Sequence, residues 1–521
     1  MPDLNAILVC SSLGGLILAF GVSLLLRVGS RAQDLPPGPK TTPILGNALQ
    51  FPTKFPCLRF TQWARTYGEI CSAKILNRNV IILSSPEAVK GVLEKQGMHT
   101  GGRFHSVILD RGVGDMFFVF ADMDTDIWRK GRKAVHPLVS AGSINNHLPI
   151  HTLEGLQLLC DMLDRPKETY YHLRRTTSSI LTYLLYGQRS LSYKGTHIEK
   201  LFRMIELMNS TTDLSAHPPV DLVPILQYIP SRWALWKVLC DQLRALRTDI
   251  YGTLFSSVTQ RLESGTPTDC YMEDLVRNRE ALGMSMEEID AAGGAIMDAG
   301  SETSASFLQN FVQLLANYPE CQRRAQEEIE GVVGSQRMPT VEDFNQLPCV
   351  NALIQELHRF RPLLPTGLPH VASKDVFYNG YRIPEGSMIF MNIWGIYRDP
   401  ELFDEPEIFK PERYLDSPFG VKPGVDTSSF KANFVFGAGR RTCPGEHMAN
   451  RTITLYAMYL LWAFDISRDG AEGADMSFEQ YAKPGVELAP LPFTLSITSR
   501  DGREAIIRSA FRELASQEFG A

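Results

Sequence analysis

One cysteine, Cys443, lies in a glycine-rich stretch, residues 436–445, that reads Phe-Gly-Ala-Gly-Arg-Arg-Thr-Cys-Pro-Gly. Pro444 follows it and suits the first position of a helix, because an apolar helical pattern begins immediately afterwards. A sulfur atom placed there meets unpaired backbone N–H groups and the positive end of a helix dipole, and both favour the thiolate. Arg441, two residues upstream, can face an anionic group. The stretch therefore predicts a stiff loop that presents a thiolate ligand for iron, against the alternative of a buried cysteine in a turn.

A second pair of reactive side chains, Glu302 and Thr303, lies inside a long apolar segment, residues 286–317. Threonine lowers helix propensity and a buried carboxylate is costly without a partner, so the pair needs an explanation. Next to Gly300, which weakens the helix, it supplies a hydroxyl and an ionisable group that together form a workable proton relay. The alternative is close helix packing over small residues. Asp298, one turn earlier on the same face, is either a second relay member or a solvated charge.

Trp128 and Arg132 stand four residues apart near the start of a capped helix, residues 124–133. An indole N–H and a guanidinium on one helix face can bind the same carboxylate from two directions. Taken alone, the pattern equally fits a solvated basic helix. Glu356 and Arg359, three residues apart on a later helix, would by themselves be a surface pair worth about 0.2–0.5 kcal/mol.

Helices must position most of these residues. From residue 142 to residue 316 the pattern is almost wholly helical, and its last part, residues 286–317, is apolar enough to run through the centre of the body. Residues 446–464 predict a long apolar helix directly after the cysteine. The helical region is interrupted at residues 187–195, 217–224 and 265–269.

Strands are few. Residues 70–75 and 80–83 are β-rich runs that read as a hairpin, preceded by a helix over residues 57–68. Residues 493–497 alternate like a strand. Residues 101–123, rich in glycine and phenylalanine without a sustained period, predict a loop that lines an apolar pocket or covers a core. The fold class is therefore mostly α with a minor β-region.

Composition excludes several classes of protein. The 521 residues are 21% charged and 44% hydrophobic, as in an ordinary globular protein, and no repeat divides them, which allows one large folded unit. A net charge of -6 argues against nucleic acid as a partner. The nine cysteines contain no Cys-x-x-Cys pair, which argues against zinc ribbons, covalent haem attachment and a disulfide framework, and suits a reducing compartment.

The N-terminus predicts a membrane anchor. Residues 4–26 carry no charge and would span roughly 33 Å as a helix, enough to cross a hydrocarbon core of about 30 Å. A signal peptide would need a basic segment in front, whereas Asp3 precedes the run and Arg27 and Arg31 follow it. This asymmetry places the body on the cytoplasmic side. A proline-rich spacer, residues 35–39, comes next.

Four motifs in one order resemble the cytochrome P-450 superfamily, and in particular its fungal microsomal members that decorate secondary metabolites. They are Trp-x-x-x-Arg at 128–132, Ala-Gly-x-Glu-Thr at 299–303, Glu-x-x-Arg at 356–359 with Pro-Glu-Arg at 411–413, and Phe-x-x-Gly-x-Arg-x-Cys-x-Gly at 436–445. The resemblance covers residues 35–500 and implies the P-450 fold, as a single catalytic unit with an N-terminal transmembrane helix. The implied boundaries are 1–27 for the anchor, 28–40 for a basic, proline-rich hinge, 41–510 for the catalytic domain and 511–521 for a tail.

The resemblance also implies roles for individual residues. Cys443 is the expected axial ligand of the iron of haem b, and Glu302 and Thr303 are the expected proton donors. Glu356, Arg359 and Arg413 are expected to form a buried network under the haem, whereas His447 is expected to be a packed or surface residue. The positions matched to cofactor binding are Phe436, Gly437, Arg441, Trp128, Arg132 and, on a looser pattern, His370.

The implied activity is a haem-thiolate monooxygenase that oxidises an apolar small molecule, with terpenoids favoured, at the endoplasmic reticulum membrane. Its electrons are expected from NADPH through a separate NADPH–cytochrome reductase, because no Gly-x-Gly-x-x-Gly follows a predicted strand. Two alternatives are a reductase-independent isomerase or dehydratase of the same fold, and a non-enzymatic membrane-tethered binder of apolar ligands. The predicted reductase-docking residues are Arg129, Lys130, Lys133 and Arg440.

Overall fold

The computed structural model describes residues 28–212, 218–470 and 487–518, together with residues 13, 20–23 and 26. The chain forms two compact units, each assembled from segments far apart in sequence. Unit 1 comprises Met1–Phe104, Thr366–Ile396 and Ala438–Arg440, and unit 2 comprises His105–Pro365, Tyr397–Gly437 and Arg441–Ala521. Both units take residues from the predicted catalytic domain, residues 41–510, whose boundaries stay a prediction. No linker marks the division, because the chain passes between the units several times.

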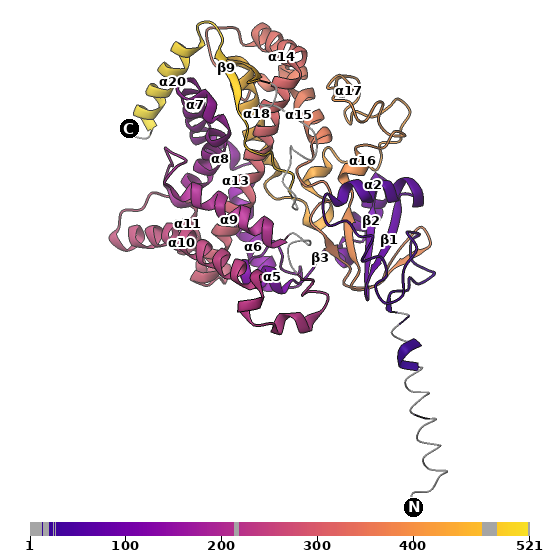
Figure 1. The fold of residues 1–521 in the computed structure, drawn as a ribbon. Helices are drawn as coiled ribbons and strands as arrows, with labels where there is room; N and C mark the ends of the chain where they lie inside the picture. The colour runs from indigo at the N-terminus through magenta and orange to yellow at the C-terminus, as the bar shows by residue number, and fades with distance from the viewer. Residues whose placement is uncertain are drawn as a thin grey trace, which may run out of the picture. The chain divides into compact units, whose positions relative to one another are not determined.

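Unit 1 contains the main sheet, with strand order β1-β2-β7-β4-β3 (Figure 1). The predicted hairpin is confirmed as the antiparallel pair β1–β2, whereas β2 and β7 pair in parallel. A second hairpin joins β5 to β6. The strands are β1 (Ile70–Ile75), β2 (Arg78–Leu83), β3 (Gly102–Arg103), β4 (His370–Val371), β5 (Val376–Tyr378), β6 (Tyr381–Ile383) and β7 (Met388–Met391).

The helices of unit 1 are short. The predicted helix over residues 57–68 is confirmed as α2, which ends at Gly68. Ser85 caps α3, and its hydroxyl accepts a hydrogen bond from the backbone N–H of Ala88. The helices are α2 (Pro56–Tyr67), α3 (Pro86–Val89), α4 (Gly97–Thr100) and α16 (Ile393–Ile396).

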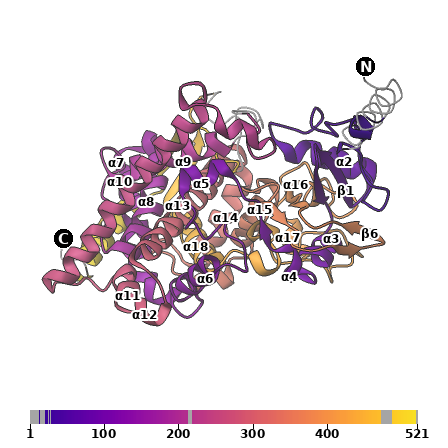
Figure 2. The same cartoon turned by 90° about the horizontal axis from the view of Figure 1, so that it is seen from below.

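Unit 2 is predominantly helical (Figures 1 and 2). Its one described sheet is the antiparallel pair of β8 (Phe464–Arg468) and β9 (Leu495–Ser499), which confirms a strand close to the predicted residues 493–497. The longer helices are α6 (Asp126–Val139), α7 (Leu148–Asp164), α8 (Thr169–Tyr186), α9 (His197–Thr212), α10 (Leu235–Ser264), α13 (Met286–Asn317), α14 (Pro319–Val332), α15 (Pro348–Phe360), α18 (Glu446–Ala463) and α20 (Arg503–Glu518). The shorter helices are α5 (Val107–Val113), α11 (Tyr271–Arg277), α12 (Arg279–Leu282) and α17 (Arg413–Asp416).

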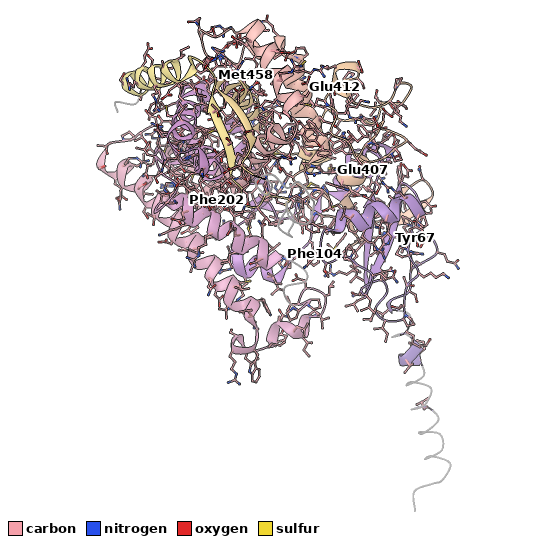
Figure 3. All side chains as sticks on the ribbon, turned by 45° about the horizontal axis from the view of Figure 1, so that its top comes forward. Tyr67, Phe104, Phe202, Glu407, Glu412 and Met458 are labelled. Atoms are coloured by element: carbon pink, nitrogen blue, oxygen red, sulfur yellow. The ribbon has the colours of Figure 1, made fainter. Side chains whose placement is uncertain are left out.

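Helix α13 is the central element of unit 2, with the bounds that its sequence predicts. It begins with a capping box, in which the Ser285 hydroxyl accepts from the Glu288 N–H and the Glu288 carboxylate accepts from the Ser285 N–H. Its 32 residues span about 48 Å, and most of them are buried among the other helices of the unit. Helix α18 also lies in this core, where Met458, labelled in Figure 3, is fully buried.

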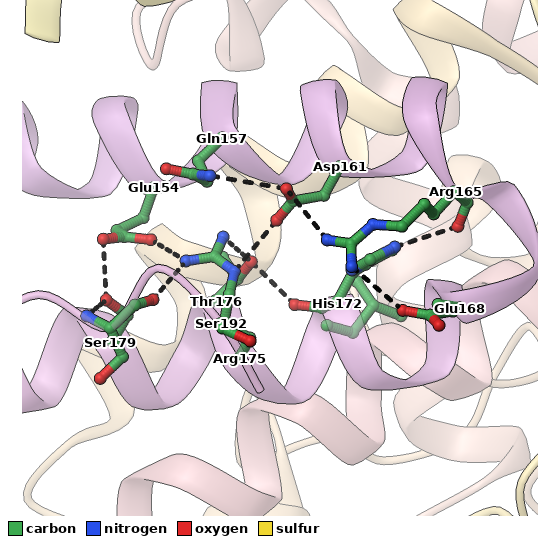
Figure 4. A network of polar contacts seen from close by, with 12 residues as sticks. Glu154, Gln157, Asp161, Arg165, Glu168, His172, Arg175, Thr176, Ser179 and Ser192 are labelled. Carbon is green, nitrogen blue, oxygen red and sulfur yellow. Dashed lines mark hydrogen bonds and ion pairs between the residues drawn. The ribbon is translucent and has the colours of Figure 1, made fainter. Parts of the chain in front are cut away.

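Helices α7 and α8 share a buried polar network (Figure 4). Arg175 on α8 forms ion pairs with Glu154 and Asp161 on α7, and Arg189 contributes a second guanidinium to Glu154. The side chains of Glu154 and Arg175 are 0% and 1% exposed. These charges therefore exist in the interior only as partners of one another.

Three predictions at the edges of the fold differ from the structure or lie outside it. Residues 101–123 contain the helix α5, which is too short to show a period in the sequence. The boundary predicted at residues 510 and 511 falls inside α20. The predicted membrane span, residues 4–26, lies almost entirely outside the described residues. Among the residues that are described, no helix has both the length and the apolar character needed to cross a membrane.

Candidate functional site

The loop before α18 is closed by the backbone. The Cys443 N–H donates a 2.8 Å hydrogen bond to the Phe436 carbonyl. Gly437 has φ 82°, in the left-handed region that favours glycine. Lys431, which the sequence analysis did not single out, donates from Nζ to the Gly437 carbonyl at 2.8 Å and to Thr442 Oγ1 at 3.4 Å. Lys431 belongs to no recognisable motif and lies twelve residues before the cysteine. Only the structure therefore shows that its ammonium group holds two parts of this loop together.

Within unit 1, the backbone around Gly439 explains why the first fixed position of the motif after Phe436 is a glycine. Gly439 has φ 62°, and a Cβ atom built there would lie 2.0 Å from the Leu93 carbonyl oxygen. Any other residue would clash with backbone at this position, so glycine is required on both conformational and steric grounds.

The helix after the cysteine begins at the predicted residue, Glu446, but Pro444 does not belong to it. Gly445 is the N-cap of α18 and Glu446 its first residue, so Pro444 lies before the N-cap and not at the first helical position. Pro444 and Gly445 form a turn instead. The proline ring suits this turn equally well, because turns of this kind accept its fixed φ. Cys443 consequently stands three residues before the first residue of the helix.

Among the eight cysteines that the structure describes, Cys443 alone is exposed. Desolvation by the surrounding protein raises the pKa of its thiol, against the opposing effects of the Gly445 backbone N–H and the Arg132 charge. The backbone N–H thus favours the thiolate, as predicted, but desolvation outweighs its effect on the pKa of Cys443. A metal ion would reverse the balance, since metal binding displaces the thiol proton.

Three residues predicted to bind an anion lie together beside the cysteine. The Arg441 guanidinium carbon lies 5.2 Å from the centre of the Trp128 ring, and Arg441 Nη2 donates to the Ala121 carbonyl at 2.6 Å. Arg132 Nη1 donates to the Thr442 carbonyl at 3.1 Å. Thr125 caps α6 by accepting from the Trp128 N–H, which confirms the predicted capped helix start.

The two guanidinium groups are partly removed from water. Burial lowers the pKa of Arg441 to about 10, and the charge of Arg132 lowers it further against the opposing charge of Asp122. Burial likewise lowers the pKa of Arg132. Two desolvated cations that repel each other form a favourable site for a carboxylate.

On one side of helix α13, four residues are not fully buried and form a short strip, which we call the open strip. Between residues 295 and 316 the residues of the helix are buried except for Ala299, Gly300, Thr303 and Ser304. Thr303 Oγ1 donates to the Ala299 carbonyl at 2.8 Å, so its lone pairs remain available to a proton donor. Glu302 is only 4% exposed and faces the protein. The helix thus presents a hydroxyl to a ligand and keeps the adjacent carboxyl inside.

Asp298 is neither a relay member nor a solvated charge. It accepts hydrogen bonds from Arg247 and from the Tyr251 hydroxyl, both on α10, and is 7% exposed. Arg247 in turn lies over the Phe117 ring, 5.2 Å from its centre. The Asp298 carboxylate is therefore engaged in a buried ion pair that links α10 to α13.

The predicted network behind the cysteine loop is confirmed. Glu356 accepts from Arg359 at 2.7 Å through both carboxylate oxygens and pairs with Arg413 at 3.2 Å. Arg359 also donates to the carbonyls of Tyr397 and Pro406. The three charged side chains are between 0% and 5% exposed, so they fix backbone and have no access to a ligand.

An aromatic bridge joins the cysteine loop to α13. The Phe436 ring lies 5.7 Å from the His358 ring on α15, which lies 4.5 Å from the Phe307 ring on α13. Burial lowers the pKa of His358 to about 3, so this histidine is neutral. Phe436 therefore positions the loop against the helix that carries Thr303.

His370 and His447, the two histidines that the sequence analysis considered, have different surroundings. His370 belongs to unit 1, where its Nδ1 lies 2.9 Å from the Thr100 carbonyl and its strand pairs with that of Arg103. Its role toward a cofactor stays a prediction. His447 is exposed, which agrees with the expected surface histidine.

Two of the four residues predicted to dock a reductase form ion pairs within the protein. Lys130 pairs with Glu288 of α13 at 2.9 Å, and Arg129 pairs with Asp126 at 2.5 Å. Lys133 and Arg440 are exposed. Lys130 therefore links α6 to the start of α13 through an ion pair, and we no longer assign it a role in docking.

Comparisons with known proteins agree with one another. The family model for cytochrome P450 matches residues 36–497. The chain is 39% identical over 505 residues to the cytochrome P450 monooxygenase ple5B of Rhodocybe pseudopiperita, covering 95% of this chain and 96% of the relative. It is 32% identical to the cytochrome P450 monooxygenase patI of Penicillium expansum, over 94% and 93% of the two chains.

Solved structures show the same fold. A zebrafish cytochrome P450 determined with progesterone has a TM-score of 0.70 at 24% identity, covering 85% of this chain and 99% of that one. With the family model, the fungal relatives and the fold in agreement, this chain belongs to the cytochrome P450 family and is a monooxygenase of that family.

Proposed function

We propose that this protein is a haem-thiolate monooxygenase that oxidises an apolar small molecule in fungal secondary metabolism, with electrons from NADPH delivered by a separate reductase. The observation that carries the proposal is the exposed Cys443 in its backbone-closed loop, beside the paired guanidiniums of Arg132 and Arg441. A soft thiolate suits iron, and two desolvated cations suit the propionates of a haem. The residues present therefore fit this group.

Each residue has a distinct task in the proposed reaction. The Cys443 thiolate would hold a haem through its iron, and the haem would supply the activation of dioxygen, which an electron-rich sulfur ligand favours. Arg441, Arg132 and the Trp128 indole would bind the propionates and so hold the haem in the protein. His370 is proposed as a further propionate contact, and the backbone at Phe436 and Gly437 holds the sulfur in place.

Proton supply is proposed to run through α13. The Thr303 hydroxyl, half-buried on the open strip, would supply a proton to the oxygen chemistry of a bound haem and would take one back from the protein side. Glu302, buried behind it, is the acid that replaces this proton. The open strip also bears Ala299 and Gly300, whose small size leaves room for the substrate.

The test of the proposed function is a carbon monoxide difference spectrum of the reduced, full-length protein. A red-shifted Soret band of the thiolate type is expected. Purified protein that binds haem without this band, or binds none, would refute the haem-thiolate assignment and leave the apolar-ligand binder as the better description.

Thr303→Ala is expected to divert electrons from product to hydrogen peroxide. Without the hydroxyl, proton delivery slows by roughly 10²-fold at the step it serves, so unproductive release competes. The ratio of peroxide to product per NADPH oxidised measures this. Ser304→Ala, a neighbour on the same strip, is the matched control and should keep the ratio of the unmodified protein; an unchanged ratio in Thr303→Ala would contradict the relay.

Lys133→Glu is expected to slow electron delivery, because Lys133 is an exposed cation on α6 that an acidic reductase surface can meet. The rate constant for first-electron transfer should fall several-fold at low salt, and the difference should shrink as salt is added. Arg59→Glu, an exposed cation on α2, serves as the control. Equal slowing in both variants would contradict a specific role for Lys133.

The substrate and the location are proposals as well. Terpenoids are favoured because the segment 101–123 is rich in phenylalanine, which suits an apolar and moderately bulky guest. Spectral titration of the protein with panels of terpenoids, polyketides and indoles would rank these substrate classes by affinity. The uncharged residues 4–26 are proposed to anchor the chain in the endoplasmic reticulum with the body in the cytoplasm, and carbonate extraction of microsomes tests this.

A further inference from the structure

A buried cation on α10 contacts the chain between α5 and α6 and has no task in the proposed function. The Arg247 guanidinium carbon lies 5.2 Å from the centre of the Phe117 ring. The Arg247 side chain is 9% exposed and Phe117 is 6% exposed. A cation over an aromatic face is attracted more strongly where water is excluded. The contact therefore fixes the start of residues 117–121, which we call the aromatic segment.

Arg247 is itself held in place by α13. It donates to the Asp298 carboxylate, which also accepts from the Tyr251 hydroxyl. Tyr251 can lie against α13 because residue 294 is a glycine, where a Cβ atom would lie 2.8 Å from the tyrosine ring. Burial lowers the pKa of Arg247, but the Asp298 and Tyr251 charges outweigh it and leave the pKa above its ordinary value. Arg247 is thus a permanent cation in a fixed position.

The aromatic segment is a compact pair of turns. The Phe120 N–H donates to the Phe117 carbonyl at 3.1 Å, and the Ala121 N–H donates to the Phe118 carbonyl at 3.3 Å. The rings of Phe117 and Phe120 stack with their centres 5.5 Å apart. Gly131 of α6 leaves room for Phe118, because a Cβ atom at residue 131 would lie 2.4 Å from that ring. A displacement at one end of the segment is therefore transmitted to the other.

The far end of the aromatic segment contacts Arg441. The Ala121 carbonyl accepts from Arg441 Nη2 at 2.6 Å, and the same guanidinium lies over the Trp128 ring. A guanidinium is planar, so a contact to one nitrogen and another to its face set the directions of its other N–H groups. The position of the Ala121 carbonyl thus determines where Arg441 points.

Arg441 requires this support. Burial lowers the pKa of Arg441 to about 10, and the nearby Arg132 charge lowers it further. Because the two cations repel each other, an unsupported Arg441 guanidinium would turn away from Arg132 and from a carboxylate that both could bind. The Ala121 carbonyl opposes this movement.

We propose that Arg247 is a positioning residue for Arg441. Arg247 fixes the start of the aromatic segment, and the carbonyl at its end directs the Arg441 guanidinium toward a haem propionate. The proposal rests on the proposed function, because a haem is the group that Arg441 would hold. It also gives Asp298 a task outside the proton relay, since this acid holds Arg247 in place.

Phe117→Leu is the main test, because it removes the ring and keeps the ion pair between Arg247 and Asp298. The full-length holoprotein should release haem to excess apomyoglobin about tenfold faster, the equivalent of one hydrogen bond to a charged group. In a protein that already carries Arg441→Gln, Phe117→Leu should add nothing, because its effect passes through Arg441. Effects that multiply in the double variant would overturn the proposal.

Tyr251→Phe is the matched control within the same cluster. It removes one hydrogen bond to Asp298 and keeps the ring whose centre lies 5.1 Å from the Arg247 guanidinium carbon. Haem release should stay at the rate of the unmodified protein. Arg247→Met should act as Phe117→Leu does, and if it fails to fold, the cycle of Phe117 and Arg441 variants still decides. Equal acceleration in Tyr251→Phe and Phe117→Leu would overturn the proposal.

Two further readouts do not depend on turnover. The reduction potential of the haem iron should fall in Phe117→Leu and stay unchanged in Tyr251→Phe, because a guanidinium at a propionate favours the reduced, less positive iron. In the full chain as purified, with or without haem, the amides of Phe120 and Ala121 should exchange faster with deuterated water in Phe117→Leu.

The outcomes separate this proposal from the proposed function. If the unmodified protein lacks the thiolate-type Soret band, the proposed function fails and no haem site remains for Arg247 to support. If the band is present and Phe117→Leu leaves the amide exchange and the haem release rate unchanged, the positioning role of Arg247 is overturned while the haem-thiolate assignment stands.

Discussion

Cys443→Ala will abolish the thiolate-type Soret band of the reduced, carbon monoxide-treated protein and all oxygenation of substrate. Within the described residues no second cysteine is exposed, so no other sulfur of that part of the chain can take its place. The fold itself should survive, because an exposed side chain in a loop closed by the Cys443 N–H leaves no cavity when it is shortened. The free energy of unfolding of the haem-free protein is expected to change by less than about 0.5 kcal/mol.

Cys349→Ala is the matched control for this experiment. Cys349 lies at the start of α15, half-buried, with its N–H donating to Glu328, so the substitution keeps the backbone contact. The control should retain the band at full height. A Cys443→Ala protein that still shows the band would place the axial ligand elsewhere and would remove the basis of the proposed function.

Arg175→Met will destabilise unit 2 by about 3–5 kcal/mol, the cost of leaving a buried charge without its partner. Arg175 contacts Glu154 and Asp161 and donates to the Ser190 carbonyl at 3.1 Å (Figure 4). Methionine fills a similar volume but leaves Glu154, which is fully buried, with Arg189 as its remaining cation. Urea-induced unfolding of the haem-free chain, followed by circular dichroism, measures the loss.

Arg165→Met separates the effect of burial from that of charge. Arg165 also pairs with Asp161, at 3.8 Å, but its side chain is 55% exposed. Solvent screens such a pair, so the expected loss is below about 1 kcal/mol. Similar losses in the two variants would show that the interior network contributes no more than a surface pair.

The long helices could be predicted from the sequence because their signals are local. Both ends of α13 were predicted, since an unbroken apolar pattern marks its body and a change of pattern marks each end. Helix α5 was missed because seven residues cannot display a helical period. The place of Pro444 outside α18 was missed because a proline before a helix fits both a turn and a first helical turn, and only the backbone angles decide.

Long-range partners explain the errors at the site. Asp298 was predicted in two roles, and both are wrong because its partners Arg247 and Tyr251 lie about fifty residues away on α10, beyond any local pattern. The net shift in the pKa of Cys443 was not predicted, because a helix terminus is visible in the sequence, whereas desolvation depends on the whole fold. The spacing in the chain places Trp128 and Arg132 on one helix face, whereas their juxtaposition with the distant Arg441 followed from the family resemblance alone.

The parallel pair β2–β7 delays formation of the main sheet until most of the chain has been translated. Strand β2 ends at Leu83, but its partner begins at Met388, so roughly 300 residues must be translated before the main sheet can close, which takes about 15–60 s at typical elongation rates. During that interval the hairpin β1–β2 has an open edge of apolar residues that can pair with another chain. The nascent polypeptide should therefore depend on chaperones that hold N-terminal strands, and slowing translation should lengthen the period in which it can aggregate.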